Sequence, residues 1–216
     1  MWAAYLLTST NPLPDMPTAA PRCQPDRIIK ASPRWEITRH QDGDTADIID
    51  TIMYADKRSA GFVLPGVQCL QADTEYKTLR NVWAFIKYNL KYRADKRGHE
   101  RIKSPGALFD SGVGDCKSYS IATGAILRAL GIPYRYRFAA YDRGEYSHVY
   151  VVADGVDGDV VLDSVYEHFD AEHPYNHIKD IRPATSPAVN GIGAATVDFT
   201  GFTIGALLAW VFLKNW

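Results

Sequence analysis

The sequence Gly-Val-Gly-Asp-Cys-Lys-Ser-Tyr-Ser at residues 112–120 decides the fold, and it runs directly into a segment of small apolar residues. Apolar residues recur at helical spacing over 116–130, which predicts an amphipathic helix packed in a core. Asp115 is suited to cap the start of this helix and Gly131 to end it. Cys116 then falls in the first turn, where unpaired N–H groups and the positive end of the helix dipole favour a thiolate. The stretch therefore predicts a nucleophilic cysteine.

After this helix the apolar period changes from 3.6 to 2. Residues 134–141 alternate aromatic and basic side chains, 146–153 are rich in valine and tyrosine, and 159–165 form a third apolar run. Turn-forming residues at 142–145 and 154–158 separate the three runs. The sequence thus predicts helices first and an antiparallel meander afterwards, which is an α+β fold with the cysteine helix packed on the sheet.

His148 and Asp163 lie on the second and third of these predicted strands. Opposed side chains on adjacent antiparallel strands are about 5 Å apart, so an imidazole and a carboxylate on one face can form a hydrogen bond. A helix packed on that face would bring the Cys116 thiol to the other ring nitrogen. A thiol, an imidazole that moves its proton, and a carboxylate that orients the imidazole are the groups that nucleophilic acyl transfer needs.

The remaining segments predict further helices and loops. Helical spacing predicts a helix over 45–57, with Asp44 as its cap, and a longer helix over 74–91. Residues 92–111 are polar and loop-like, with room for a short helical piece at 105–110, and 169–180 are predicted to be a polar loop.

Four separate motifs resemble one family. Gly-Asp-Cys at 114–116, Leu-Arg-Ala-Leu-Gly-Ile-Pro at 127–133, Ser-His-Val-Tyr-Val at 147–151 and Val-Leu-Asp at 161–163 closely resemble the transglutaminase-like superfamily of papain-like thiol enzymes. The resemblance covers about residues 74–170 and places the motifs in the family's order. It implies a papain-like core with Cys116, His148 and Asp163 as the catalytic residues, and it implies no cofactor.

The resemblance also implies acyl-transfer chemistry at an amide. We expect hydrolysis of a peptide or amide bond through a thioester, with a protein, peptide or cell-wall peptide as substrate. Two alternatives stay open: a cross-linking transglutaminase, and a virion or tail component that uses the fold for binding. Residues 83–105 are similar to a subgroup found among phage and prophage virion and tail proteins, which is the reason for the second alternative.

The group that stabilises the oxyanion is not fixed by the pattern. The backbone N–H of Cys116 is one donor at a helix start. Asn89, Tyr92 and Gln68 are candidate side-chain donors, Asp115 is a candidate cleft residue, and the charge of Lys117 is expected to favour the thiolate.

Composition excludes other classes of function. The chain has 216 residues and a formal net charge of −1, so it offers no electrostatic reason to bind nucleic acid. Cys23 and Cys69 could pair, but free thiols in a reducing compartment such as the cytoplasm are the simpler interpretation. His168, His173 and His177 fit no standard zinc spacing, so we predict no metal site.

The two ends of the chain differ from the middle. We expect 1–43 to be an extended, proline-rich arm, 44–182 the catalytic domain, 183–191 a linker and 192–216 a hydrophobic helix. The apolar run 199–213 spans only about 22 Å as a helix, short of the roughly 30 Å hydrocarbon core of a bilayer. We therefore weigh a marginal membrane anchor, a helix in an oligomer or virion interface, and a helix docked on its own domain, and favour the first two.

Overall fold

The computed structural model describes residues 23–32, 36–39, 45–96, 100–142, 144–187 of the chain. Two predictions lie outside these residues, the cap at Asp44 and the apolar helix over 192–216, and the arm predicted over 1–43 lies partly outside them. Within the described ranges, no helix combines the length and the apolar character needed to cross a membrane. The division of the chain into arm, domain, linker and terminal helix stays a prediction.

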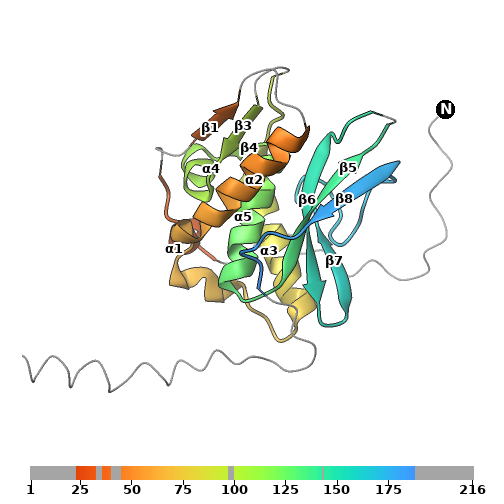
Figure 1. Cartoon of the computed structure of the whole chain (residues 1–216). Helices are drawn as coiled ribbons and strands as arrows, with labels where there is room; N and C mark the ends of the chain where they lie inside the picture. The colour runs from red at the N-terminus through yellow and green to blue at the C-terminus, as the bar shows by residue number, and fades with distance from the viewer. Residues whose placement is uncertain (1–22, 33–35, 40–44, 97–99, 143, 188–216) are drawn as a thin grey trace, which may run out of the picture.

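A four-stranded antiparallel sheet forms one side of the molecule (Figure 1). Its order is β7 (Gly158–Leu162), β6 (His148–Gly155), β5 (Tyr134–Ala140) and β8 (His177–Ile181). The predicted meander is confirmed in β5, β6 and β7. The predicted loop over 169–180 is wrong at its end, because β8 pairs with β5. β8 is a polar edge strand, which needs only backbone pairing and salt bridges and therefore shows no apolar alternation.

The helices cover one face of this sheet, and α5 (Cys116–Ala129) lies at the centre of the packing (Figure 1). It contacts β5 and β6 as well as three other helices, α2 (Thr45–Ser59), α3 (Glu75–Asn89) and α4 (Pro105–Ser111). Side chains of Ile121, Ala122 and Ile126 are fully buried against Val149 and Val151 from the sheet. The α+β fold expected from the sequence is therefore the observed one, with the cysteine helix packed on an antiparallel sheet.

The segment 92–111, predicted to be a loop, contains one short strand, β3 (Glu100–Lys103), and a second short strand pair flanks it. β3 pairs with β1 (Glu36–Arg39), and β2 (Lys91–Tyr92) pairs with β4 (Val113–Gly114). The predicted short helix is present as α4. The β2–β4 pair matters for the site, because it aligns Tyr92 with Gly114, two residues before Cys116.

The segment before α2 joins the core. A single-turn helix, α1 (Pro25–Ile28), begins at a proline, which is favoured at the first helical position, and Ile28 is fully buried. Two 3₁₀ helices, η1 (Ala60–Phe62) and η2 (Pro65–Leu70), follow α2. The prediction of free thiols is wrong for Cys23 and Cys69, because a disulfide joins them across 46 residues of sequence.

A buried carboxylate ties α2, α5 and β5 together. Asp56 is fully buried, and its Oδ1 accepts hydrogen bonds from Tyr134 Oη at 2.7 Å and Tyr136 Oη at 2.6 Å. Arg128, in the last turn of α5, contacts its Oδ2 at 3.3 Å. Gly124 leaves room for the two tyrosines, since a Cβ there would lie 2.6 Å from Tyr136 Oη. We call Asp56, Tyr134, Tyr136 and Arg128 the Asp56 cluster.

Candidate active site

The start of α5 presents Cys116 at its first helical position. Asp115 caps the helix as predicted: its Oδ1 accepts from the Ser118 backbone N–H at 3.1 Å and from Ser118 Oγ at 2.9 Å. Before the cap, Gly112 has φ +66°, a left-handed conformation that ends α4 and turns the chain toward Cys116. The thiol is partly exposed and is the free thiol among the described cysteines.

Ser120 fixes the first turn of α5 to the sheet. Its Oγ lies 2.8 Å from the Cys116 carbonyl oxygen and 3.0 Å from the Val149 carbonyl oxygen. Val149 follows His148 in β6, so this buried hydroxyl connects the backbone of the cysteine to the strand that carries the histidine. Nothing in the local sequence marked this serine, because its partner lies 29 residues away.

His148 connects the other two predicted residues. Its Nε2 lies 2.7 Å from Asp163 Oδ2, which leaves Nδ1 as the ring nitrogen available to the Cys116 thiol. Burial alone would lower the pKa of His148, but hydrogen bonds to Asp163 and to Cys116 outweigh it and raise the pKa to about 10. The histidine is therefore held as an imidazolium between a carboxylate and a sulfur at neutral pH.

His148 lies on the face of the sheet opposite to the predicted one, which is the face that the helices cover. Val149 and Val151 face the helices, while His148 pairs with Ala139 and shares the opposite face of the sheet with Tyr150. His148 can still interact with Cys116 because it is the first residue of β6, where the strand ends beside the start of α5. The sequence predicts a strand that begins at residue 146, before His148, whereas in the structure His148 is the first residue of β6.

Helix α3 holds Asp163 in position. Asp163 follows directly after β7 and is 5% exposed, and its Oδ1 accepts from the Val165 backbone N–H at 3.0 Å. Its carbonyl oxygen accepts from the fully buried Trp83 Nε1 at 2.9 Å. Lys87 Nζ, one turn further along α3, donates to the Val165 and Tyr166 carbonyl oxygens. The helical spacing over 74–91 gave no sign that Trp83 supports Asp163, because the two residues are 80 positions apart.

A cavity of about 330 Å³ opens beside Cys116 and His148. Tyr92, Asp115 and Lys117 also line it. Burial, followed by the nearby Cys116 and Asp115, raises the pKa of Tyr92 to about 12, so its hydroxyl stays a hydrogen-bond donor over the physiological range.

Two of the candidate oxyanion donors lie elsewhere. The Asn89 amide donates to the Phe85 carbonyl oxygen at 2.9 Å, within its own helix, and Asn89 is not among the residues that line the cavity. Gln68 lies in η2 and is likewise absent from the lining. Of the three side-chain candidates, Tyr92 is the one that the structure brings beside Cys116.

Lys117 is surrounded by carboxylates. Its Nζ lies 2.6 Å from Glu100 Oε2 and 3.6 Å from Asp95 Oδ2, and it also contacts Asp115. These three acidic residues are spaced closely enough to hold a metal ion, and the lysine ammonium lies against all three. Burial would lower the pKa of Lys117, but the Asp115 carboxylate, followed by Cys116 and Glu100, outweighs it and raises the pKa. Its charge is thus balanced by carboxylates rather than directed at the thiol alone.

Aromatic rings surround the histidine. The ring centroids of Tyr141 and Tyr150 lie 6.0 and 5.5 Å from that of His148. Tyr141 ends the alternating run 134–141, and no local signal distinguished it from the other aromatic residues of that run. The ring of His173 packs against those of Tyr166 and Tyr141. Among the described residues, no group of side chains close enough to bind a metal ion includes His168, His173 or His177.

Comparisons with known proteins give a family match for part of the chain. The family model of the transglutaminase-like superfamily core matches residues 67–171. Among solved structures, a candidate protease from Parabacteroides distasonis is 16% identical over 54% of this chain and 26% of its own, with a TM-score of 0.44. A candidate cysteine protease from Cytophaga hutchinsonii is 18% identical over 70% of this chain and 54% of its own, with a TM-score of 0.39.

A third structure, a TGase, is 11% identical over 62% of this chain and 36% of its own, with a TM-score of 0.36. The chain thus spans between a quarter and about half of the length of these solved proteins. No curated protein matches the chain significantly. The family model and the observed fold lead to one assignment: through residues 67–171, this chain belongs to the transglutaminase-like superfamily.

Proposed function

We propose that the protein is a cysteine-dependent acyl-transfer enzyme that hydrolyses peptide or amide bonds. The observation that carries the proposal is His148, whose Nε2 binds Asp163 while its other nitrogen serves the Cys116 thiol beside an open cavity. An imidazolium next to a sulfur favours the thiolate, which is the reactive form of a cysteine.

In the proposed reaction, the Cys116 thiolate adds to the carbonyl carbon of the amide. His148 then gives its proton to the departing amine, and the acyl group stays on the sulfur as a thioester. A water molecule next gives a proton to His148 and its oxygen to the acyl carbon. The carboxylic acid leaves, and the thiolate and imidazolium are restored.

Two donors are suited to the oxyanion of the tetrahedral intermediate. One is the backbone N–H of Cys116, at the N-terminus of α5, where N–H groups have no partner within the helix. The other is the Tyr92 hydroxyl, which stays protonated at neutral pH and lines the same cavity. In this proposal Asp163 keeps the ring of His148 oriented and stabilises its charge.

Peptide turnover in H₂¹⁸O tests the proposal and separates hydrolysis from transfer to an amine. The full chain and its Cys116→Ser variant are each incubated with a defined peptide mixture and an added primary amine, and the products are analysed by mass spectrometry. Hydrolysis predicts new carboxylates that carry one ¹⁸O, formed only by the unmodified chain. Products that gain the mass of the amine would indicate a cross-linking enzyme, and identical product sets from both chains would contradict the proposal.

A further inference from the structure

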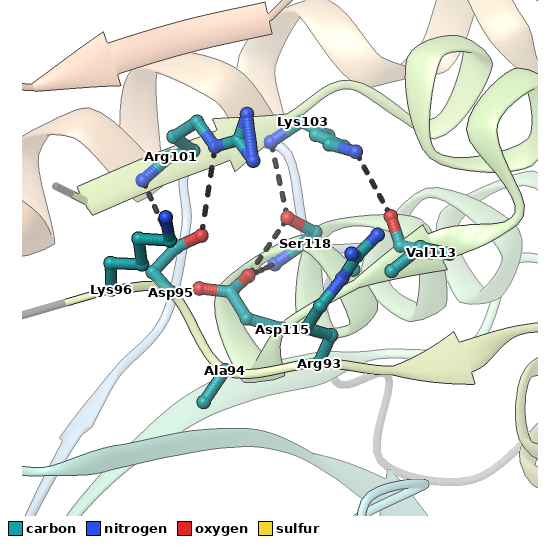
Figure 2. A pocket seen from close by; sticks show the side chains of 10 residues that line it. Arg93, Ala94, Asp95, Lys96, Arg101, Lys103, Val113, Asp115 and Ser118 are labelled. Carbon is teal, nitrogen blue, oxygen red and sulfur yellow. Dashed lines mark hydrogen bonds and ion pairs between the residues drawn. The ribbon is translucent and has the colours of Figure 1, made fainter.

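A second cavity of about 330 Å³ adjoins the one beside Cys116 (Figure 2). Ala94, Asp95 and Asp115 line both cavities, so these three residues form the wall between them. The second cavity lies on the side of this wall away from His148. We call it the basic cavity, because four of its lining residues are lysine or arginine: Arg93, Lys96, Arg101 and Lys103.

The four cations come from two segments that approach Asp115 and Ser118 from different sides (Figure 2). Arg101 and Lys103 belong to β3, and Arg93 and Lys96 to the segment that follows β2. The β2–β4 pairing holds this segment in place, because the Arg93 backbone N–H donates to the Gly114 carbonyl oxygen at 2.8 Å. A chain with a net charge of −1 therefore concentrates positive charge next to its reactive cysteine.

Little of this positive charge is neutralised. Lys103 Nζ donates to two neutral acceptors, Ser111 Oγ and the Val113 carbonyl oxygen, each at 3.0 Å. Arg93 and Lys96 have no carboxylate partner within the part of the chain that the structure describes, whereas Arg101 Nε lies 3.8 Å from Asp95 Oδ1.

The two acidic residues in the wall do not cancel the four positive charges that line the cavity, and Lys117, which contacts both from the side of the Cys116 cavity, offsets part of their negative charge. An anion that enters the basic cavity therefore meets a net positive field. Ser118 stiffens the floor of the cavity, since its Oγ accepts from the Lys103 backbone N–H at 3.1 Å and donates to Asp115 Oδ1.

We infer that the basic cavity binds a carboxylate of the substrate, which makes the preferred substrate an acidic peptide. The inference rests on the proposed function, because it assigns the cavity to the substrate that Cys116 attacks. A carboxylate on a glutamate or aspartate side chain and one at a free C-terminus share this chemistry. Arginine and lysine bind either of them through charge-assisted hydrogen bonds.

Binding can be measured without turnover on the full chain that carries Cys116→Ser. Three fluorescein-labelled hexapeptides serve as probes in anisotropy titrations: one with three glutamates and an amidated C-terminus, one with three glutamines and an amidated C-terminus, and the glutamine peptide with a free C-terminus. We expect at least one carboxylate-bearing peptide to bind about tenfold more tightly than the amidated glutamine peptide, and higher salt to reduce the difference. The peptide that gains affinity identifies the source of the carboxylate.

The double variant Arg93→Gln/Lys96→Gln tests the location. Both side chains are exposed, so we expect the variant to fold, which its thermal unfolding verifies. It should lose about fivefold or more of the preference for carboxylate. The matched control Lys57→Gln/Lys179→Gln changes the net charge equally at exposed positions that do not line the cavity, and it should keep the preference.

Equal binding of all three peptides, or an equal loss in the control variant, would overturn the inference. These outcomes are separable from failure of the proposed function. A chain that hydrolyses glutamate and glutamine peptides equally well, and binds them equally, retains the proposed function but has no carboxylate subsite. A chain that prefers carboxylate at Arg93 and Lys96 but forms no product in H₂¹⁸O has the binding site without the enzyme.

Discussion

Helix α5 has a buried carboxylate near each end, and the two carboxylates have different partners. Near its last turn, Asp56 is fully buried and accepts from the hydroxyls of Tyr134 and Tyr136. Near its first turn, Asp163 is 5% exposed and binds His148. Each tyrosine hydroxyl uses its single proton on Asp56, whereas His148 has a second nitrogen for Cys116.

Because of this difference, we assign Asp56 a role in stability and Asp163 a role in the proposed chemistry. Burial, followed by Asp56, raises the pKa of both tyrosines, so they stay neutral hydrogen-bond donors to Asp56. His148 can titrate, and it lies in an open cavity beside a thiol. We therefore take Asp163 as the candidate for function, because its partner His148 can exchange a proton with Cys116, whereas the tyrosines bound to Asp56 cannot do so.

Asp163→Asn should have the largest effect on chemistry. The amide can no longer stabilise an imidazolium, so we expect kcat/KM on a substrate peptide to fall by about 10²- to 10⁴-fold. Measured by urea denaturation near pH 10, where the stabilisation from the His148 proton is largely lost, the free energy of unfolding should change by only about 1 kcal/mol. A variant with full activity would show that His148 acts without Asp163.

The corresponding substitution Asp56→Asn should lower stability and leave activity unchanged. Asp56→Asn leaves a tyrosine hydroxyl and the Arg128 guanidinium poorly matched in the core, so we expect a loss of about 3 kcal/mol in the free energy of unfolding. Activity per folded molecule should be unchanged. Asp50, exposed on the same helix, is the control, and Asp50→Asn should shift stability by less than about 0.5 kcal/mol.

The disulfide provides a second test of the stability side. Cys23→Ala/Cys69→Ala removes a cross-link that closes a loop of 46 residues, which we expect to cost about 2–4 kcal/mol of unfolding free energy. Intact-mass analysis after alkylation without reductant checks the pairing itself. One carbamidomethyl group is expected on the native protein, and three after reduction. Three groups without reductant would restore the prediction of free thiols.

The pH dependence of stability should report the titration of His148. The folded pKa of His148 is raised to about 10 from an ordinary value near 6.5, so the folded state binds this proton more tightly than the unfolded state. The resulting stabilisation is fully present below about pH 6.5 and is lost as the pH rises to about 10. The difference in unfolding free energy between the wild type and His148→Gln should therefore shrink over this interval. A difference that is constant with pH would contradict the raised pKa.

Sequence reasoning found the parts of the fold and site that local pattern controls. Helical spacing after Asp115 and the change of period after Gly131 predicted α5 and the meander, and the Cys-His-Asp order predicted three candidate site residues that the structure brings together. These features depend on neighbours within a turn of helix or across one hairpin.

Sequence reasoning missed contacts between residues that are far apart in the sequence. Trp83 supports Asp163 across 80 residues, and Cys23 joins Cys69 across 46. β8 is polar because its side chains bind charges on β5: Asp180 pairs with both Arg135 and Arg137. Neither helical nor alternating periodicity contains this information, since it arises only when the sheet has formed.

The rate of alkylation of Cys116 tests the central claim most directly, namely that His148 activates this thiol. The native protein, His148→Gln and the control His168→Gln, an exposed histidine, are each treated with iodoacetamide at pH 7, and carbamidomethylation of Cys116 is followed by mass spectrometry. We predict that His148→Gln reacts about 10- to 100-fold more slowly than the native protein, because the imidazolium no longer favours the thiolate, and that His168→Gln reacts at the native rate. Equal rates for all three proteins would contradict the account.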